Sequence, residues 1–374
     1  MPESNPMTSI PDNTQISVDE ANLHYENGLA KVKVKDYLGA MEDFNRSIEI
    51  NPRLFKAFSE RGFVKFKLYD SNGAIEDCNI SLAIEPIHAR GYHVRGISKY
   101  MLSDYIPALN DLNIAIELAP DNANSYYCRG LTYNRIGNYD TALADFSKTL
   151  ELEPNNDGAF LNRGASYYEL KIYPMALVDY NEGIRLDPTD ANSYYNRGLV
   201  NNKMRNYYEA IKDYNRAIEL GDTNARVYLN RGILKESTDD NPGAIADYNQ
   251  AIRIDPKYIK AHLRRISLKF VLKDWKGCIA YCTKAIKIDS IAGQVHAIRG
   301  NTEAHMGNYD GAIKDCSKAI NLNPEDYWAY SIRGTAKKFA GDTIGAEIDY
   351  KRADELRPKD VNAVKTNSNR KWVN

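Results

Sequence analysis

Apolar and polar positions recur along the chain with the period of an amphipathic helix, and the pattern restarts every 34 residues. Within residues 123–137, Tyr126, Gly130 and Tyr133 follow an i, i+4, i+7 spacing that places them on one helical face. A second stretch, residues 139–153, carries a comparable face of small and apolar side chains. A proline follows it, and proline cannot continue a helix interior. The pattern therefore predicts two amphipathic helices joined by a short turn.

Ten copies of this pattern occupy residues 21–360 without insertion or deletion. Glycine and alanine recur at fixed positions because two helices that cross closely leave no room for larger side chains. A chain of 374 residues exceeds the roughly 250–300 residues at which a single core stops growing. Stacked repeats avoid that limit, because each repeat packs only against its neighbours. The repeats begin at residues 21, 55, 89, 123, 157, 191, 225, 259, 293 and 327.

Most repeats share six columns of residues: aromatic, glycine, aromatic, alanine, aromatic and proline. An Arg-Gly pair marks the glycine column at 61–62, 95–96, 129–130, 163–164, 197–198, 231–232, 299–300 and 333–334. This 34-residue helix–turn–helix pattern resembles the tetratricopeptide repeat family over about nine-tenths of the chain. The resemblance implies an all-α, right-handed superhelical solenoid, with first helices along a concave groove and second helices on the convex side. It also implies a role in protein–protein interaction, without identifying the partner.

The two ends of the chain differ from the repeats. Residues 1–16 contain three prolines and few aromatics, so we expect a disordered N-terminal tail. The sequence Ser17-Val18-Asp19-Glu20 is a capping box, which predicts that the helical array of residues 17–360 starts there. At the other end, residues 361–374 are expected to form a short capping helix or a frayed tail.

The charge balance excludes several classes of protein. Lys plus Arg number 49 and Asp plus Glu 50, which argues against a nucleic-acid binder and against a polybasic membrane surface. No apolar run approaches the roughly 20 residues of a spanning helix, so no membrane insertion is expected. The first residues show no secretory signal, and the five cysteines form no CxxC pair. These features favour a cytoplasmic protein with reduced thiols.

Catalytic chemistry is not indicated. The sequence has no phosphate-binding glycine loop, no HExxH motif and no nucleophile elbow, so we expect no catalytic residues and no cofactor. Cys278 and Cys282 stand four residues apart on one predicted helix and could supply half a metal site. However, Cys282 falls in the same packing column as Phe146 and Tyr180, which favours a core role and no metal. The chain is therefore predicted to be a scaffold or adaptor, not an enzyme.

A column of arginines and a column of aspartates run through the array in fixed register. Arg precedes the glycine position in nine repeats, with Asn27 in the first, and Asp stands on the second helix of nine, with Tyr281 in the eighth. Pairing within a repeat would leave Asp43 and Arg265 without partners. Pairing each Asp with the Arg of the next repeat accounts for both ends of the array. We therefore predict ion pairs between neighbouring repeats, with a charged rail for a ligand as the functional alternative.

The opposite face of each first helix should line the groove. Helical geometry places the second, sixth, ninth and thirteenth residues of every repeat on this face, which we call the groove stripe. It contains nine Lys or Arg and three Glu. An excess of positive charge on a neutral protein predicts a preference for an anionic partner. The alternative is that these side chains merely solvate exposed helix faces.

Asparagine occupies the sixth position of three consecutive repeats, at Asn162, Asn196 and Asn230. An amide offers both donors and an acceptor, so it can bond a peptide backbone without reading side chains. The column resembles the asparagine ladder of some superhelical tetratricopeptide proteins, although YxNRG could simply be a favoured local sequence. We predict that other proteins bind through an extended, acidic segment. The predicted peptide-binding residues are Asn162, Asn192, Asn196, Lys203, Arg226, Asn230, Lys260 and Arg264.

The family's carboxylate clamp, which holds a C-terminal Asp or Glu of a chaperone, is only half matched. Asn230, Lys260 and Arg264 correspond to its later members, but Tyr195 and Leu199 occupy the places of its first Lys and Asn. A looser acidic-peptide site is therefore predicted. One alternative is a regulatory or co-chaperone-like partner of another protein.

A second alternative is a structural scaffold that uses the convex face or the last repeat. That repeat places Trp328, Ile332 and Phe339 on its groove stripe, which would form an apolar patch unless residues 361–374 cover it. The eighth repeat breaks several columns at once and is expected to change the local curvature of the solenoid. Its exceptions are Ile266 for Gly, Cys278 for Ala, Tyr281 for Asp and Ser290 for Pro.

Overall fold

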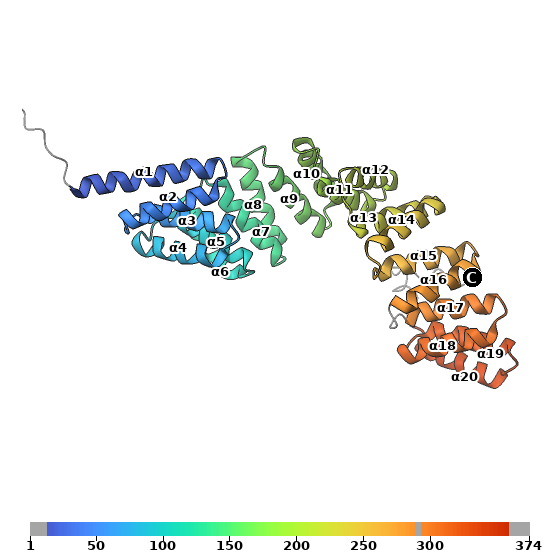
Figure 1. The fold of residues 1–374 in the computed structure, drawn as a ribbon. Coiled ribbons are helices and arrows are strands. Elements are labelled where there is room, and N and C mark those ends of the chain that lie inside the picture. Colours follow the sequence, from blue (N-terminus) through green and yellow to red (C-terminus); the bar gives the residue numbers. More distant parts are fainter. Residues whose placement is uncertain (1–12, 289–292, 359–374) are drawn as a thin grey trace, which may run out of the picture. The chain divides into compact units, whose positions relative to one another are not determined.

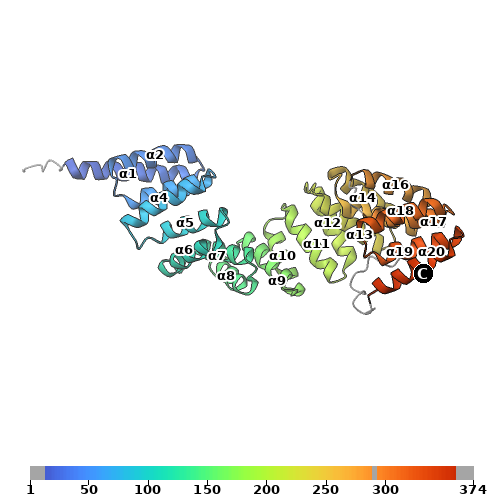
Figure 2. The same cartoon turned by 90° about the horizontal axis from the view of Figure 1, so that it is seen from below.

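A computed structural model describes residues 13–288 and 293–358, and all of their regular structure is α-helical. The chain forms two compact units, which we call the N-terminal unit (Met1–Pro188) and the C-terminal unit (Thr189–Asn374). Within each unit the helices pack as consecutive antiparallel pairs in chain order (Figures 1 and 2). The prediction of an all-α fold built from two-helix repeats is confirmed.

The N-terminal unit holds the first ten helices. They are α1 (Asn13–Lys33), α2 (Tyr37–Ile50), α3 (Phe55–Lys67), α4 (Ser71–Ile84), α5 (Ala89–Met101), α6 (Tyr105–Leu118), α7 (Ala123–Arg135), α8 (Tyr139–Leu152), α9 (Asp157–Glu169) and α10 (Tyr173–Leu186). The C-terminal unit holds the other ten. They are α11 (Ala191–Lys203), α12 (Tyr207–Glu219), α13 (Ala225–Ser237), α14 (Asn241–Ile254), α15 (Ile259–Val271), α16 (Trp275–Ile288), α17 (Gly293–His305), α18 (Tyr309–Leu322), α19 (Tyr327–Phe339) and α20 (Thr343–Leu356).

The start of α1 differs from the prediction, because the helix begins at Asn13, four residues before Ser17. Three other expectations concern residues outside the described ranges: the rest of the expected N-terminal tail (1–12), Ser290, and the tail or capping helix of residues 361–374. None of the helices in residues 13–288 and 293–358 has both the length and the apolar character needed to cross a membrane.

The turn between the two helices of a repeat has the same form throughout the described chain. Its fifteenth residue has a positive φ in every repeat, yet it is glycine in only three of them. In the second repeat Tyr69 has φ 65°, and the following Asp70 donates its N–H to the Lys65 carbonyl at 2.9 Å. That bond is the long-range bond of a helix-ending Schellman turn. Asp70 then caps α4 by accepting the N–H of Gly73 at 2.9 Å.

The glycine column marks the closest approach of the two helices. A Cβ added at Gly232 would lie 2.7 Å from the ring of Tyr248, which stands sixteen residues later on the second helix. The eighth repeat reverses these sizes, because Ile266 replaces the glycine and the small Cys282 stands opposite. Both side chains are fully buried in one core cluster, with Cys278. The predicted core role of these cysteines is confirmed, and the change in curvature stays a prediction.

The prediction that Arg and Asp pair between neighbouring repeats is wrong. Each pair forms within one repeat: Arg61 bonds Asp77 through Nε at 2.8 Å and Nη2 at 2.6 Å. The glycine column explains this geometry. Gly62 packs against Cys78 on the second helix, so the residues that precede them, Arg61 and Asp77, are neighbours as well. The other pairs of this kind in the described chain are Arg95–Asp111, Arg129–Asp145, Arg163–Asp179, Arg197–Asp213, Arg231–Asp247, Arg299–Asp315 and Arg333–Asp349.

Pairing within a repeat leaves Asp43 without an arginine and Arg265 without an aspartate, and both residues make other contacts. Asp43 forms an ion pair with Lys31, with 2.8 Å between Oδ2 and Nζ. Arg265 stacks on the ring of Tyr281, with its guanidinium carbon 3.7 Å from the ring centroid. Burial lowers the pKa of Arg265 because no carboxylate compensates for its desolvation.

The arginines do connect neighbouring repeats, but through neutral side chains. Nη1 of Arg61 donates to the side-chain Oδ1 of Asn45 in the preceding repeat at 2.9 Å, and Nη1 of Arg265 donates to Oδ1 of Asn249 at 2.7 Å. Serine or threonine takes the place of asparagine in other repeats, for example Thr283 as the acceptor for Arg299. One guanidinium therefore holds its own repeat together and also bonds the repeat before it.

Candidate functional site

The first helices lie where neighbouring repeats are closest together. In the N-terminal unit α1, α3, α5, α7 and α9 contact one another in succession, and in the C-terminal unit α13, α15, α17 and α19 do the same. Successive second helices of the described chain make no comparable contact. The groove stripe of each unit is therefore carried by helices that form its inner layer.

Three of the five cations on the groove stripe of the N-terminal unit, Lys67, Arg90 and Arg135, make contacts within the unit. Arg90 bonds both carboxylate oxygens of Glu60 at 2.9 Å, and its guanidinium lies 4.3 Å from the centre of the Phe63 ring. The Lys67 ammonium lies 5.2 Å from the same ring. Arg135 donates to the Tyr100 hydroxyl at 3.0 Å. These contacts reduce the charge that this stripe offers to a ligand.

The C-terminal unit presents its stripe cations differently. Lys203 on α11, Arg226 on α13 and Lys260 on α15 are exposed, and Arg264 on α15 is half-buried. None of the four takes part in an ion pair among the described residues, where the ion pairs of this unit join its carboxylates to other cations. Their positive charge is therefore available to attract an anionic partner.

Tyrosines lie beside two of these cations. Burial raises the pKa of Tyr195 and of Tyr258, and in both cases the positive charge of Arg226 opposes the rise. Burial likewise raises the pKa of Tyr248, and Arg264 opposes it. Each phenol stays neutral near pH 7 and adds no negative charge beside the arginines, but the Tyr248 hydroxyl donates to the Glu236 carboxylate and the Tyr195 hydroxyl accepts from Asn230.

Two members of the asparagine column are already hydrogen-bonded. Asn162 donates its amide N–H groups to the Tyr127 hydroxyl at 3.1 Å and to the Gly158 carbonyl at 2.8 Å. Asn230 donates to the Tyr195 hydroxyl at 3.1 Å, which leaves it a second N–H and its carbonyl oxygen. Asn162 can therefore offer a peptide only an acceptor, whereas Asn230 can offer both a donor and an acceptor.

The remaining predicted residues fall on three helices of the C-terminal unit. Asn196 is half-buried on α11. Asn192, one turn earlier, is exposed but bonds the helix-capping Asp190 through its amide at 3.3 Å. Asn162 lies on α9 in the N-terminal unit, apart from the other seven. The structure thus groups Lys203, Asn192 and Asn196 on α11, Arg226 and Asn230 on α13, and Lys260 and Arg264 on α15.

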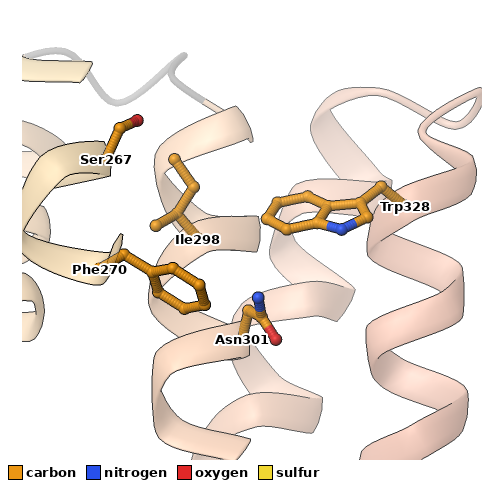
Figure 3. Close-up of a pocket in the computed structure, with 5 residues that line it drawn as sticks. All are labelled: Ser267, Phe270, Ile298, Asn301 and Trp328. Carbon is orange, nitrogen blue, oxygen red and sulfur yellow. The ribbon is translucent and has the colours of Figure 1, made fainter. Parts of the chain in front are cut away.

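A small cleft on the first helices of the last three repeats was not predicted. We call it the apolar slot, and it is lined by Ser267, Phe270, Ile298, Asn301 and Trp328. Figure 3 shows the rings of Trp328 and Phe270 with Ile298 between α15 and α19. All of these residues except Phe270 belong to the groove stripe, so reading the stripe across repeats, and not within the last repeat alone, would have found it.

The apolar patch predicted in the last repeat is divided. Ile332 is buried in the core, and Trp328 is half-buried at the apolar slot. Phe339 is 66% exposed and stacks on Tyr309, with ring centres 5.4 Å apart and planes 13° from parallel. Only Phe339 therefore presents a largely exposed ring.

Family models agree with the repeat pattern. Three models, two described as "Tetratricopeptide repeat" and one as "TPR repeat", match residues 123–156, 167–204, 191–224, 225–258 and 294–326. No curated protein sequence matches the chain.

Several solved structures align with parts or most of the chain. A tetratricopeptide repeat protein from Parabacteroides merdae ATCC 43184 covers 63% of this chain and 94% of its own, with 21% identity and a TM-score of 0.47. YrrB, described as a TPR protein with an unusual peptide-binding site, covers 50% and 96%, with 21% identity and a TM-score of 0.45. Yeast Tom70 covers 90% and 85%, with 16% identity and a TM-score of 0.42.

The assignment rests on the matched family models and on the helix pairs themselves. Each pair in the described chain keeps the 34-residue period and the same turn, and nine of the ten pairs cross closely at glycine. Taken together, these features and the matched models show that the chain carries tetratricopeptide repeats.

Proposed function

We propose that this protein-interaction scaffold binds an extended, acidic segment of another protein along the groove stripe of its C-terminal unit. The observation that carries the proposal is the set of four cations without ion pairs, Lys203, Arg226, Lys260 and Arg264, on successive first helices. An extended peptide that crosses these helices meets the cations in turn, and its backbone reaches the free amide groups of Asn230.

The wider predicted site keeps a smaller part in this proposal. Asn196 is placed to contact the same segment, and Asn192 would first have to leave Asp190. Asn162 lies in the N-terminal unit and takes no part in the site proposed for the C-terminal unit. The partial resemblance to a carboxylate clamp rests on Asn230, Lys260 and Arg264, which lie on two neighbouring helices, α13 and α15. A C-terminal carboxylate of a partner would be one form of the acidic ligand.

The test is a selection of random twelve-residue peptides on the immobilised full chain, followed by anisotropy titrations of the enriched peptides. We expect enrichment in Asp and Glu, and weaker binding as salt rises, because ions screen exposed charges beyond about 8–10 Å. Reversing Arg226, Lys260 and Arg264 to Glu should weaken binding roughly a hundredfold, at about 1 kcal/mol for each lost pair.

The matched control reverses three exposed cations on second helices, Arg253, Lys276 and Lys287, and so changes the net charge equally. Its affinity should stay within about threefold of the wild type, since long-range effects of exposed charges are screened. Peptides that bind both variants equally well would move the function to the convex face or the last repeat.

A further inference from the structure

In the described chain no helix covers the outer face of α1, which packs against α2 and α3 on its other side (Figure 1). In the later repeats the third and tenth residues of the first helix pack under the second helix of the preceding repeat, as Val227 and Leu234 do with Tyr214. Both positions are buried in all nine later repeats. In the first repeat they are Leu23 and Ala30, and both are exposed, Leu23 by 60%.

This open face is apolar. Helical geometry places Leu23, Asn27, Ala30 and Val34 on one line at the i, i+4, i+7 and i+11 positions, which we call the outer stripe. Val34 is 75% exposed. The third residue of the later repeats is Ala, Gly, Ser or Val, so Leu23 is the largest side chain at this position. Terminal repeats of a solenoid need a polar outer face to stay soluble, so an apolar stripe there indicates a partner.

The other end of the array does not complement the outer stripe. Between neighbouring repeats an arginine donates to Asn, Ser or Thr of the preceding repeat. Asn27 replaces that arginine in the first repeat, and Lys351 replaces the acceptor in the tenth. Asp354 has a side chain that is 74% exposed, at the position where Ile320 of the ninth repeat is 7% exposed. Head-to-tail stacking of two copies would therefore lack both the bond and the apolar contact that join repeats.

The charges around the outer stripe instead complement a second copy of the same helix. Glu20 and Glu26 lie on α1, and Lys33 and Lys35 lie at its end. All four are exposed, and the ion pairs of the first repeat in the described chain involve other residues. Two α1 helices that pack antiparallel on their outer stripes bring the glutamates of one copy toward the lysines of the other. Parallel packing would set like charges against each other.

We propose that the outer stripe of α1 binds a second copy of this chain, in an antiparallel pair of α1 helices related by a two-fold axis. In such a symmetric pair Leu23 of each copy lies toward Val34 of the other. The 21-residue α1 is about 31 Å long, and a pair of single helices buries less than the roughly 1,200 Å² of a stable interface. The dimer should therefore be weak and reversible, with a dissociation constant on the order of 10–100 µM. This inference concerns the N-terminal unit and does not depend on the acidic-peptide site.

The experiment is sedimentation equilibrium of the full chain between about 1 and 300 µM, a range that brackets the expected dissociation constant. The wild type should change from monomer to dimer. A variant with Leu23→Asp and Val34→Asp should weaken the dimer at least about a hundredfold, because each dimer would bury four carboxylates. Both side chains are exposed in the single chain, so the variant should fold, and a circular dichroism melt checks this.

The matched control changes two equally exposed apolar side chains of the same unit. Ile106→Asp on α6 and Val178→Asp on α10 add the same charge at residues that are 61% and 53% exposed. Their dimer should stay within about threefold of the wild type, because exposed charges far from the contact are screened. An equal loss in the control would overturn the assignment of the dimer to α1.

Charge reversal tests the antiparallel arrangement. Glu20→Lys with Glu26→Lys should weaken the dimer about tenfold, because lysines then face lysines across the interface. Adding Lys33→Glu and Lys35→Glu to the same chain exchanges the two signs and should restore the affinity to within about threefold of the wild type. A fourfold variant no tighter than the double variant would overturn the antiparallel pair.

The remaining outcomes concern other occupants of the outer stripe. A wild-type chain that stays monomeric throughout the concentration range would overturn the proposal and leave the stripe to a different protein. A chain that dimerises only after residues 1–12 are deleted would show that its own N-terminal segment covers the stripe, and would overturn the proposal as well. A dimer that persists in the variant with Leu23→Asp and Val34→Asp would place the interface elsewhere.

Discussion

The second and the eighth repeats differ at the positions that hold the two helices of a repeat together. In the second repeat Asp77 binds both Arg61 and Lys65, and Gly62 admits the second helix closely. In the eighth repeat Arg265 has an aromatic ring instead of a carboxylate, and the equivalent Lys269 turns to Asp274 in the loop at 2.8 Å.

The groove stripes of the two repeats differ in the same sense. The stripe carboxylate Glu60 of the second repeat neutralises Arg90 of the third, whereas Lys260 and Arg264 of the eighth repeat have no ion pair in the described chain. The repeat that departs most from the common pattern thus carries two of the four cations of the candidate site, Lys260 and Arg264. Local departures from a sequence pattern are expected at functional sites, because function sets different requirements there.

The largest expected effect breaks the packing of the eighth repeat. Ile266→Gly should destabilise the chain by about 4 kcal/mol, since it removes a fully buried side chain and places glycine inside a helix. Adding Cys282→Tyr should recover part of this loss, because a ring would then fill the space as Tyr248 does at Gly232. Urea unfolding followed by circular dichroism measures both. If the double variant were no more stable than Ile266→Gly, the idea that Ile266 and Cys282 exchange the small and large side chains of the other repeats would be refuted.

Removing the charge partner should affect the two repeats unequally. Asp77→Asn leaves Arg61 and Lys65 without their carboxylate at a site where Asp77 is 2% exposed, so it should cost about 3 kcal/mol. Tyr281→Phe keeps the ring under Arg265 and should cost less than about 0.5 kcal/mol. Equal losses in the two variants would contradict the assignment of Arg265 to the ring.

The ninth repeat offers a smaller and pH-dependent test. Glu303 stands where Lys31, Lys65, Lys99, Lys235 and Lys337 bind the aspartate of their own repeats. Burial raises the pKa of Glu303, and the negative charge of Asp315 raises it further. Glu303→Lys should therefore stabilise the chain by about 1 kcal/mol at pH 7.

The sign of the pH dependence follows from the raised pKa. The folded state holds the Glu303 proton more tightly than the unfolded state does. The free energy of unfolding therefore falls as pH rises from the ordinary pKa of a glutamate through the raised pKa of Glu303. Glu303→Gln removes the titrating group, and its stabilising effect should be larger at pH 7 than at pH 4. Melting curves at the two pH values measure the difference, and an equal effect at both would contradict the burial of this carboxylate.

The smallest expected effect on stability comes from the turn between the two helices, and it should be the same in the second and the eighth repeats. Tyr69 and Lys273 have φ values of 65° and 57° in the shared turn. Tyr69→Gly and Lys273→Gly should each stabilise by about 0.5 kcal/mol, because glycine removes the steric cost of a left-handed residue but loses more entropy on folding. A stabilisation confined to one repeat would show that the turns differ.

Much of the fold was predictable from the period of the sequence. The helices predicted over 123–137 and 139–153 correspond to α7 and α8, because glycine, proline and a regular apolar face each act locally. The left-handed residue of the turn was not predictable at positions such as Tyr69, since a bulky side chain rarely adopts that conformation.

The pairing of arginine and aspartate was mispredicted for an identifiable reason. The pairing was inferred from the exceptions at the two ends of the array. The glycine column is the better guide, because it brings the eighth residue of a repeat against the twenty-fourth. The arginine at position 7 is then next to the aspartate at position 23 of the same repeat. The apolar slot was missed because it is shared by three repeats and includes Phe270, which is not on the groove stripe. Contacts that depend on neighbouring helices cannot be read from one helix alone.

The two kinds of bond made by the arginines are not distributed evenly along the array. In the eighth repeat Arg265 ties α15 to Asn249 on α14, and Arg299 ties α17 to Thr283 on α16, but no ion pair ties α15 to α16. A partial unfolding event could separate α15 from α16 while both inter-repeat bonds remain intact. The network of charged arginine pairs is therefore interrupted inside this repeat and not between two repeats, and there the buried cluster of Ile266, Cys278 and Cys282 alone takes over the role that an ion pair shares elsewhere.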